Sequence, residues 1–480
     1  MAEPRYNAGY KLLRLFADIR HGEAPKALLL ALNVFLLLLA YYILKPLRES
    51  LLLVDKNSAV VKSVLGGAQA VLFVFVIKAF SRLASKVPRH ILITWTTSFF
   101  ISNLVIFFFL HKGGMAVKPM GILFFVWVGI FNYFVIAQFW GFANDLYSDE
   151  VGKRTFPLVA LGATLGGLVA TLPFMRKLRD LLGGNWEFKL MLIAGIVLFL
   201  CIVLARTIHH REVRKTEQDR DKGLAGAAEK AQVQEQPLKA GGGFRLVFKS
   251  RYLLLIAIMI GLYNFVNATG EFIITTVAVN QSIDGAAGQE RAAEALPAAS
   301  QTLPRQTESK AIHNTFMDYQ FLTNLIALVI QLFFVSRIFK WVGIGGALLF
   351  LPIIALGGYA LISFGAVLVL VRWVKALENG TDYSLQNTTK AALFLVTKRE
   401  EKYKAKAAID TFFVRGGDTV SALAVLVGTQ LLGLKIERYA LLNVAVVAAL
   451  LVICFKIIKA YKRRKAAMDA VAAAGAVARP

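Results

Sequence analysis

The chain has few cysteines and few charged residues, and it lacks a nucleotide-hydrolysis motif. It has two cysteines, Cys201 and Cys454, and both lie in apolar segments, which favours packing as small hydrophobic side chains over a disulfide. The six histidines lie in loops or at the ends of apolar runs, without metal-ligand spacing. No G-x-x-x-x-G-K-S/T pattern occurs, so a fused ATP-hydrolysing motor is not indicated. The sequence therefore predicts no enzyme, no metal and no cofactor.

Apolar residues dominate instead. Hydrophobic residues make up 57% of the 480 positions and charged residues 18%, with a mean hydropathy of +0.59. A net charge of +25 would indicate nucleic-acid binding in a soluble protein. Here lysine and arginine gather in short segments between apolar runs, which is typical of the cytoplasmic loops of membrane proteins. The predicted partner is a lipid bilayer, and no nucleic acid is expected.

The apolar runs have the length of membrane-spanning helices. A hydrocarbon core about 30 Å thick needs about 20 apolar residues in a helix. The sequence predicts an all-α polytopic membrane protein with twelve transmembrane helices, near residues 27–53, 59–80, 91–110, 119–146, 155–175, 188–206, 252–279, 314–336, 342–363, 365–392, 407–432 and 438–458.

Two polar inserts organise the chain. Residues 208–243 are charged and rich in alanine and glycine, as in a linker, and predict a division into six-helix bundles at 1–207 and 244–480. A second insert, 281–312, is predicted to be an external loop. Lysine and arginine concentrate in alternate connections, which places both termini in the cytoplasm. The first 26 residues show no small-residue cleavage site, so no removable signal peptide is expected.

The first apolar segment carries Lys45, Arg48 and Glu49, whose spacing puts them on one helix face. Arginine offers a planar fork to phosphate or carboxylate and lysine a point charge, while Glu49 could orient Arg48 in the empty site. The alternative is an internally neutralised ion pair near the external interface, with Lys45 reaching the headgroups. Two cations against one anion favour the anion site.

The two halves resemble each other. The first and seventh segments align so that Glu271 falls opposite Glu49. Six-plus-six repeats are the architecture of the major facilitator fold, whose substrate site lies near mid-membrane. Glu271 could pair with Arg48, exchange a proton, or form a structural salt bridge.

The tenth segment carries Arg372, Lys375, Glu378 and Asp382, with Lys390 near its cytoplasmic end. An ionised side chain at the bilayer centre costs at least ~2.5–3.5 kcal/mol. Lys375, Glu378 and Asp382 share one helical face, so we expect this face to line a cavity rather than to meet lipid.

The eleventh segment contains Arg415 and Asp418 one turn apart, with Gly416 and Gly417 between them. The two charged residues can hold each other. The glycines allow close approach of a helix or a ligand, and helix packing is the favoured role.

Several strings in the chain are distinctive. They are FWGFAN at 139–144, KR at 153–154 and FPL at 156–158 in the first half, and YSL at 383–385 and KAKAAID at 404–410 in the second. These strings resemble the ATP/ADP translocase family of plastids and obligate intracellular bacteria. The resemblance extends over most of residues 25–460. It implies a twelve-helix, facilitator-like carrier in the bacterial inner membrane that exchanges ATP for ADP, or that imports nucleotides with protons.

At the positions of the family's characteristic charged residues, this chain has other residues. Arg48 corresponds to the family's first-span lysine, Asn267 to its seventh-span glutamate and Asp418 to its eleventh-span lysine, while its fourth-span glutamate falls near Val128.

The sequence thus predicts a secondary transporter for nucleotides or another phosphorylated anion, working by alternating access. Alternatives are a proton-coupled carrier of an organic acid or other small solute, and a membrane scaffold that moves no solute. The oligomeric state is not predicted. The predicted substrate-binding residues are Lys45, Arg48, Glu49, Asn267, Glu271, Lys375, Asp382, Lys390, Arg415 and Asp418.

Overall fold

The computed structural model describes residues 19, 23–84, 87, 89–147, 149–221, 243–293, 303–398, 401 and 405–477. Within these ranges the secondary structure consists of helices joined by turns and short connections, without a β-strand. The predicted all-α fold is confirmed. By internal contacts the chain divides into two compact units, Met1–Leu52 with Phe75–Pro237, and Leu53–Val74 with Leu238–Pro480.

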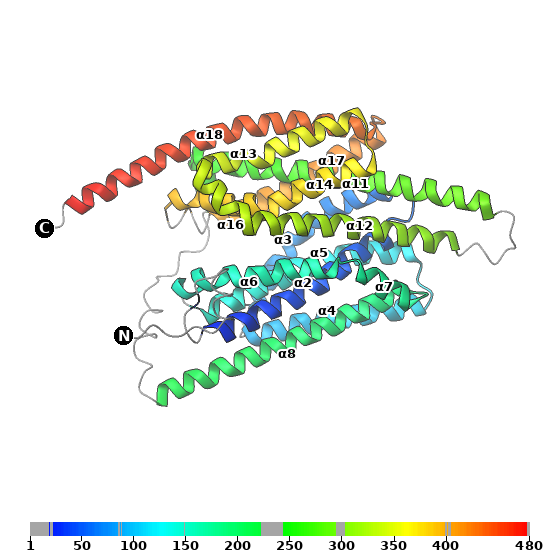
Figure 1. Cartoon of the computed structure of the whole chain (residues 1–480), viewed down its shortest axis with the longest axis horizontal. Helices are drawn as coiled ribbons and strands as arrows, with labels where there is room; N and C mark the ends of the chain where they lie inside the picture. The colour runs from blue at the N-terminus through cyan, green and yellow to red at the C-terminus, as the bar shows by residue number, and fades with distance from the viewer. Residues whose placement is uncertain are drawn as a thin grey trace. The chain divides into compact units, whose positions relative to one another are not determined.

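The first unit is built around one apolar helix. It contains α2 (Ala24–Leu52), α4 (Arg89–Lys112), α5 (Val117–Leu146), α6 (Asp149–Ala170), α7 (Phe174–Leu182) and α8 (Trp186–Asp221). Helix α2 packs against α5, α6 and α8, and α8 packs along α4 (Figure 1). A Cβ at Gly162 or Gly166 would overlap the backbone oxygens of Ala31 and Phe35, so these glycines let α6 approach α2 closely.

The second unit contains most of the remaining helices. These are α10 (Gly243–Lys249), α11 (Arg251–Ala293), α12 (Leu303–Val329), α13 (Val335–Phe364), α14 (Leu368–Thr381), α15 (Asn387–Leu393), α16 (Lys406–Ala408), α17 (Val414–Gln430) and α18 (Ile436–Val477). Helix α13 lies beside α18, α11 contacts both α17 and α18, and α12 contacts α14 (Figure 1). Helix α3 (Ser58–Ala84) begins in this unit, because its residues up to Val74 group with it by contacts.

Among the described residues, three π-helical segments join one helix to the next. They are η2 (Ile330–Phe334), η3 (Asp382–Gln386) and η6 (Ile409–Phe413). Segment η3 joins α14 to α15, and η6 joins α16 to α17. Isolated π-turns inside helices often occur at functional sites. Segments η3 and η6 lie in the predicted tenth and eleventh spans, where the sequence places its charged residues.

Each of the twelve predicted spans coincides with helical structure. Eight helices among the described residues are long and apolar enough to cross a membrane, or nine if the bent pair Arg154–Ala170 and Phe174–Leu182 is one span. The predicted eighth and ninth spans form one continuous apolar stretch, Glu308–Phe364, in which Gly343 breaks the helix with φ 68°. The stretch at Ser58–Phe73 is shorter, and the tenth span is interrupted by η3. The chain is an integral multi-pass membrane protein.

Two expected loops are partly helical. Helix α8 continues to Asp221, so the first part of the predicted linker 208–243 is helix rather than loop. Residues 222–242 of that linker lie outside the described residues. Helix α11 likewise continues to Ala293 and α12 begins at Leu303, so the predicted loop 281–312 is helical at both ends, and its residues 294–302 lie outside the described residues.

Candidate functional site

A lysine without exposed surface lies in the second unit. Lys375 on α14 is 0% exposed, and its Nζ is 2.9 Å from Oε2 of Glu378, one turn along the same helix. Nζ also donates to Oδ1 of Asn267 on α11 at 2.9 Å and to Oδ1 of Asn379 at 3.4 Å. An isolated buried ammonium is strongly unfavourable, so these acceptors are what makes its position stable.

Glu378 is held from a third helix. The Tyr359 hydroxyl on α13 donates to its Oε2 at 2.7 Å. Gly270 on α11 makes room for this arrangement, because a Cβ there would overlap the Tyr359 hydroxyl and come within 3.0 Å of Nζ of Lys375. Glycine is thus needed here for the close approach of side chains from α13 and α14.

Glu271 accepts hydrogen bonds from two other helices. The Tyr319 hydroxyl on α12 donates to its Oε1 at 2.6 Å, and Nδ2 of Asn379 donates to the same oxygen at 3.2 Å. Asn379 therefore links the two carboxylate groups, since its Oδ1 accepts from Lys375 while its Nδ2 donates to Glu271.

A second lysine reaches Glu271 from α3. Nζ of Lys62 lies 3.9 Å from Oε2 of Glu271, donates to Oγ1 of Thr275 at 2.9 Å, and stands 4.9 Å from the ring centroid of Phe316. We refer to these residues together as the buried polar network; its members are Lys62, Asn267, Glu271, Tyr319, Tyr359, Lys375, Glu378 and Asn379.

The two ion pairs of the network differ in the exposure of their side chains. The side chains of Lys375 and Glu378 are 0% and 6% exposed, whereas those of Lys62 and Glu271 are 10% and 28% exposed. Two lysines and two glutamates balance each other. The Lys375–Glu378 pair is enclosed by its neighbours, while the longer Lys62–Glu271 pair includes the partly exposed carboxylate of Glu271 and is thus the better candidate for exchange with a charged ligand.

Two further ion pairs lie in the π-interrupted helices. Lys390 donates to Oδ1 of Asp382 at 2.9 Å, so Asp382 pairs with Lys390 across η3, although the sequence places it on one face with Lys375 and Glu378. Nη1 of Arg415 is 3.3 Å from Oδ2 of Asp418. The guanidinium of Arg415 also lies 4.4 Å from the ring centroid of Phe73 on α3, a cation–π contact.

The glycines beside Arg415 differ in their surroundings. A Cβ at Gly417 would overlap the carbonyl oxygen of Gly261 and come within 2.9 Å of Cβ of Asn264, both on α11. A Cβ at Gly416 would meet nothing within 4 Å. The favoured packing role therefore holds for Gly417, which lets α17 approach α11.

In the first unit, Arg48 forms an ion pair with Glu49. Its Nε donates to Oε1 of Glu49 at 3.1 Å, and its guanidinium lies 4.6 Å from the ring centroid of Phe125 on α5. Nζ of Lys45 stands 5.6 Å from the ring centroid of Tyr42. Glu49 is 2% exposed. This is the geometry expected for a carboxylate that orients Arg48.

The structure thus joins Asn267, Glu271 and Lys375 in one network and pairs the other predicted residues locally. Their substrate-binding roles stay predictions. The predicted substrate-binding residues did not include Lys62, Tyr319, Tyr359, Glu378 and Asn379. Lys62 and Glu378 carried a signal, because both are charged residues within apolar runs. The two tyrosines carried none, because aromatic residues make up 11% of the chain. Among the described residues, no group of histidine, cysteine, aspartate or glutamate side chains could hold a metal ion.

Comparison with known proteins supports a carrier. Residues 115–273 match the model of the TLC ATP/ADP transporter family. The ADP,ATP carrier protein 1 of Chlamydia muridarum (strain MoPn / Nigg) is 24% identical over 477 residues, which cover 86% of this chain and 83% of that protein.

Solved structures share the fold. A mutant of the nucleoside transporter NupG superposes with a TM-score of 0.59 at 13% identity, covering 90% of this chain and 99% of that chain. A bacterial homolog of the human lysosomal transporter Spinster, inward-facing and unoccupied, gives a TM-score of 0.56 at 13% identity, covering 93% and 99%. These likenesses establish a transporter-type helical fold. Together with the matched family model and the relative that aligns along most of its length, they show that this chain resembles the TLC ATP/ADP transporter family.

Proposed function

We propose that this chain is a secondary carrier that moves nucleotides across the bacterial inner membrane by alternating access, with both termini in the cytoplasm. The substrate is an adenine nucleotide or another phosphorylated anion, and the carrier exchanges it without changing it chemically. The match to the TLC ATP/ADP transporter family model and the similarity to a protein named an ADP,ATP carrier support this substrate class. The facilitator-type fold supports the alternating-access cycle.

The observation that carries the proposal is the long Lys62–Glu271 pair inside apolar helices, in which Glu271 is partly exposed. Its N–O separation of 3.9 Å is at the limit of an ion pair, and Glu271 is also stabilised by Tyr319 and Asn379. A phosphate oxygen can therefore replace Glu271 as the partner of Lys62 without leaving the carboxylate unsolvated. Charge-assisted bonds to phosphate are roughly twice as strong as neutral hydrogen bonds.

The first unit offers a second place for phosphate. Lys45 and Arg48 carry two positive charges against the single charge of Glu49, so this cluster is net positive. The guanidinium of Arg48 packs on Phe125, which fixes the orientation of its planar fork. We infer that Arg48 contacts the phosphate tail of the substrate.

Exchange in proteoliposomes tests the proposal. Vesicles loaded with ATP should take up labelled ADP, and Lys62→Gln should lower the uptake rate on the order of tenfold, as expected for the loss of one charged contact worth about 1.5–3 kcal/mol. Lys435→Gln is the matched control, because Lys435 is exposed and lies between α17 and α18. Uptake of lactate as fast as that of ADP would contradict the nucleotide assignment.

A proton-coupled carrier of an organic acid is the second candidate. Glu271 favours it, because a partly exposed carboxylate held by Tyr319 and Asn379 is suited to bind and release a proton. Uptake that depends on an imposed proton gradient and persists without internal nucleotide would support this candidate. Uptake that requires internal nucleotide and ignores the proton gradient would support exchange.

A further inference from the structure

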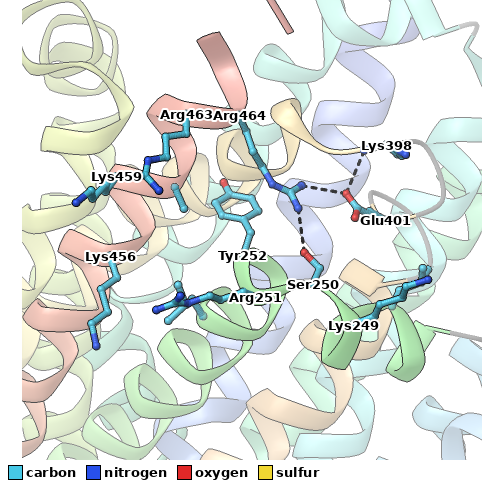
Figure 2. Close-up of a pocket in the computed structure, with 13 residues that line it drawn as sticks. Lys249, Ser250, Arg251, Tyr252, Lys398, Glu401, Lys456, Lys459, Arg463 and Arg464 are labelled. Atoms are coloured by element: carbon cyan, nitrogen blue, oxygen red, sulfur yellow. Dashed lines mark hydrogen bonds and ion pairs between the residues drawn. The ribbon is translucent and has the colours of Figure 1, made fainter. Parts of the chain in front are cut away.

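A strongly basic cavity lies in the second unit, apart from the buried polar network. Its volume is about 1170 Å³, and it is lined by residues from α10, α11 and α18 and by Lys398 and Glu401 (Figure 2). A cavity of this size accommodates a small ligand, since ligand pockets commonly measure about 300–1,000 Å³.

Six exposed cations surround this cavity. They are Lys249, Arg251, Lys398, Lys456, Lys459 and Arg463. Lys456, Lys459 and Arg463 follow one another at helical spacing on α18, next to Arg251 on α11 (Figure 2). In the part of the chain that the structure describes, none of the six forms an ion pair with a carboxylate.

Among the described residues that line the cavity, Glu401 carries the one carboxylate, and this carboxylate already has partners. Oε2 of Glu401 is 3.2 Å from Nη1 of Arg464 and accepts the backbone N–H of Lys398 at 3.3 Å. Arg464 is further fixed by its hydrogen bond to Oγ of Ser250 at 3.0 Å and by Tyr252, whose ring centroid is 4.7 Å from its guanidinium (Figure 2). Glu401 and Arg464 thus offset each other's charge, and the six exposed cations make up the remaining charge of the cavity wall.

The cavity lies at the level expected for the membrane surface. A helix crosses the hydrocarbon core in about 20 residues. Because α18 begins at Ile436, it reaches the far surface near Lys456, where the basic stretch starts. The distribution of lysine and arginine predicts that this end is cytoplasmic. Juxtamembrane clusters of lysine and arginine attract anionic phosphate groups at such a surface.

We propose that this cavity binds a phosphate group, supplied either by the headgroup of an acidic phospholipid or by a free phosphate-bearing solute. The lysines of α18 and Arg251 of α11 contact the phosphate oxygens, and the start of α11 adds the positive end of its helix dipole. The site is separate from the proposed transport site and does not depend on the transported substrate.

The test measures the thermal stability of the full-length protein in phosphatidylcholine nanodiscs by tryptophan fluorescence. One arm adds dioctanoyl phosphatidylglycerol and the other adds inorganic phosphate. The double variant Lys456→Gln with Lys459→Gln removes two charges from the cavity wall. The control, Lys462→Gln with Lys465→Gln, removes the same charge from exposed positions of α18 that do not line the cavity.

We expect at least one probe to raise the melting temperature of the wild-type protein and of the control. The cavity variant should need on the order of twentyfold more probe, because each basic residue contributes on the order of fivefold to the binding of an acidic surface. A response to phosphatidylglycerol alone identifies a lipid headgroup, and an equal response to inorganic phosphate identifies a soluble ligand. The single variant Lys459→Gln should show an intermediate effect. It also tests the site if the double variant fails to fold.

The proposal is overturned if neither probe stabilises the wild-type protein. It is also overturned if the cavity variant and the control lose the response equally, because the binding would then reflect diffuse surface charge rather than this cavity.

Discussion

Lys375 illustrates how the fold accommodates charge within apolar helices. Its ammonium has no exposed surface, yet Glu378, Asn267 and Asn379 supply acceptors from two helices. A buried ion pair is weak evidence for stability on its own, because hydrophobic residues of similar volume often stabilise as well or better. Removing only one partner is much more harmful, since it leaves an uncompensated charge.

This difference predicts the behaviour of substitutions at the sealed pair. Lys375→Met should lower the free energy of unfolding by about 3–5 kcal/mol, because Glu378 is left without its cation. The double substitution Lys375→Met with Glu378→Leu should recover most of that loss. Thermal unfolding in detergent measures both, with Lys435→Met as a surface control. A double variant that is less stable than the single one would contradict the pairing.

Arg48 should behave differently, because we place it in the substrate site rather than in the framework. Arg48→Gln should abolish the increase in melting temperature that ADP produces, while leaving the melting temperature without nucleotide almost unchanged. Arg48→Lys keeps the charge but loses the planar fork, so it should retain only part of the response. Differential scanning fluorimetry with ADP makes the measurement, and an unaltered response in Arg48→Gln would remove Arg48 from the site.

At the scale of single residues, the sequence identified many of the charges but not their partners. Asn267, Glu271 and Lys375 do share a network, and Arg415 does pair with Asp418. Asp382 shares its predicted helix face with Lys375, and its ion-pair partner in the structure is Lys390, which lies eight residues along the chain and beyond η3. A π-turn has no simple sequence signature, so this partner could not be predicted from spacing.

At the scale of helices, the close approach of α11, α13 and α14 depends on Gly270. Most glycines in an exposed helix are mildly unfavourable relative to alanine, by roughly 0.5–1 kcal/mol. Gly270 reverses this preference, because a Cβ would overlap the Tyr359 hydroxyl. Gly416 offers the opposite case, with open space around its Cβ position.

The two glycines give a matched pair of substitutions. Gly270→Ala should lower the melting temperature and impair transport, because Tyr359 and Lys375 must shift. Gly416→Ala should leave stability unchanged or raise it slightly, in line with the helix propensity of alanine. Adding Tyr359→Phe to Gly270→Ala should restore part of the stability by removing the overlapping hydroxyl. Thermal unfolding compares all three, and equal effects of the two alanine substitutions would refute the packing argument.

Helix ends were harder to predict than helix positions. Apolar length located all of the predicted spans within helices, because lipid forces the backbone to satisfy its own hydrogen bonds. Lipid imposes no such limit beyond the membrane, so α8 and α11 continue into segments that the composition marked as linker and loop. A charged amphipathic sequence remains compatible with helix in water, and composition alone does not show where it ends.

At the scale of the whole molecule, the predicted topology can be tested by labelling. Both native cysteines are buried, so single engineered cysteines give a clear signal. Arg214→Cys, at an exposed position on α8, should react only after the cytoplasmic side becomes accessible. Gln281→Cys, at an exposed position on α11, should react from outside intact cells. Reaction of Arg214→Cys with an impermeant reagent in intact cells would overturn the orientation.

Family resemblance and apolar periodicity together predicted the class of the molecule. The fold, the family and the multi-pass membrane character all follow from strings and runs visible in the sequence. The composition could not reveal that Lys62 of α3 meets Glu271 of α11, because this meeting depends on helix packing over a long sequence separation. Tyr319 and Tyr359 entered the network for the same reason.

The internal balance of the buried polar network bears on how the carrier responds to voltage. Moving one elementary charge through a potential of 100 mV involves about 2.3 kcal/mol. Lys62 and Lys375 offset Glu271 and Glu378, so the network of the empty carrier adds no net gating charge. The network should therefore contribute little to any voltage dependence of the return step. Any current during turnover would report the difference in charge between the nucleotides that enter and leave.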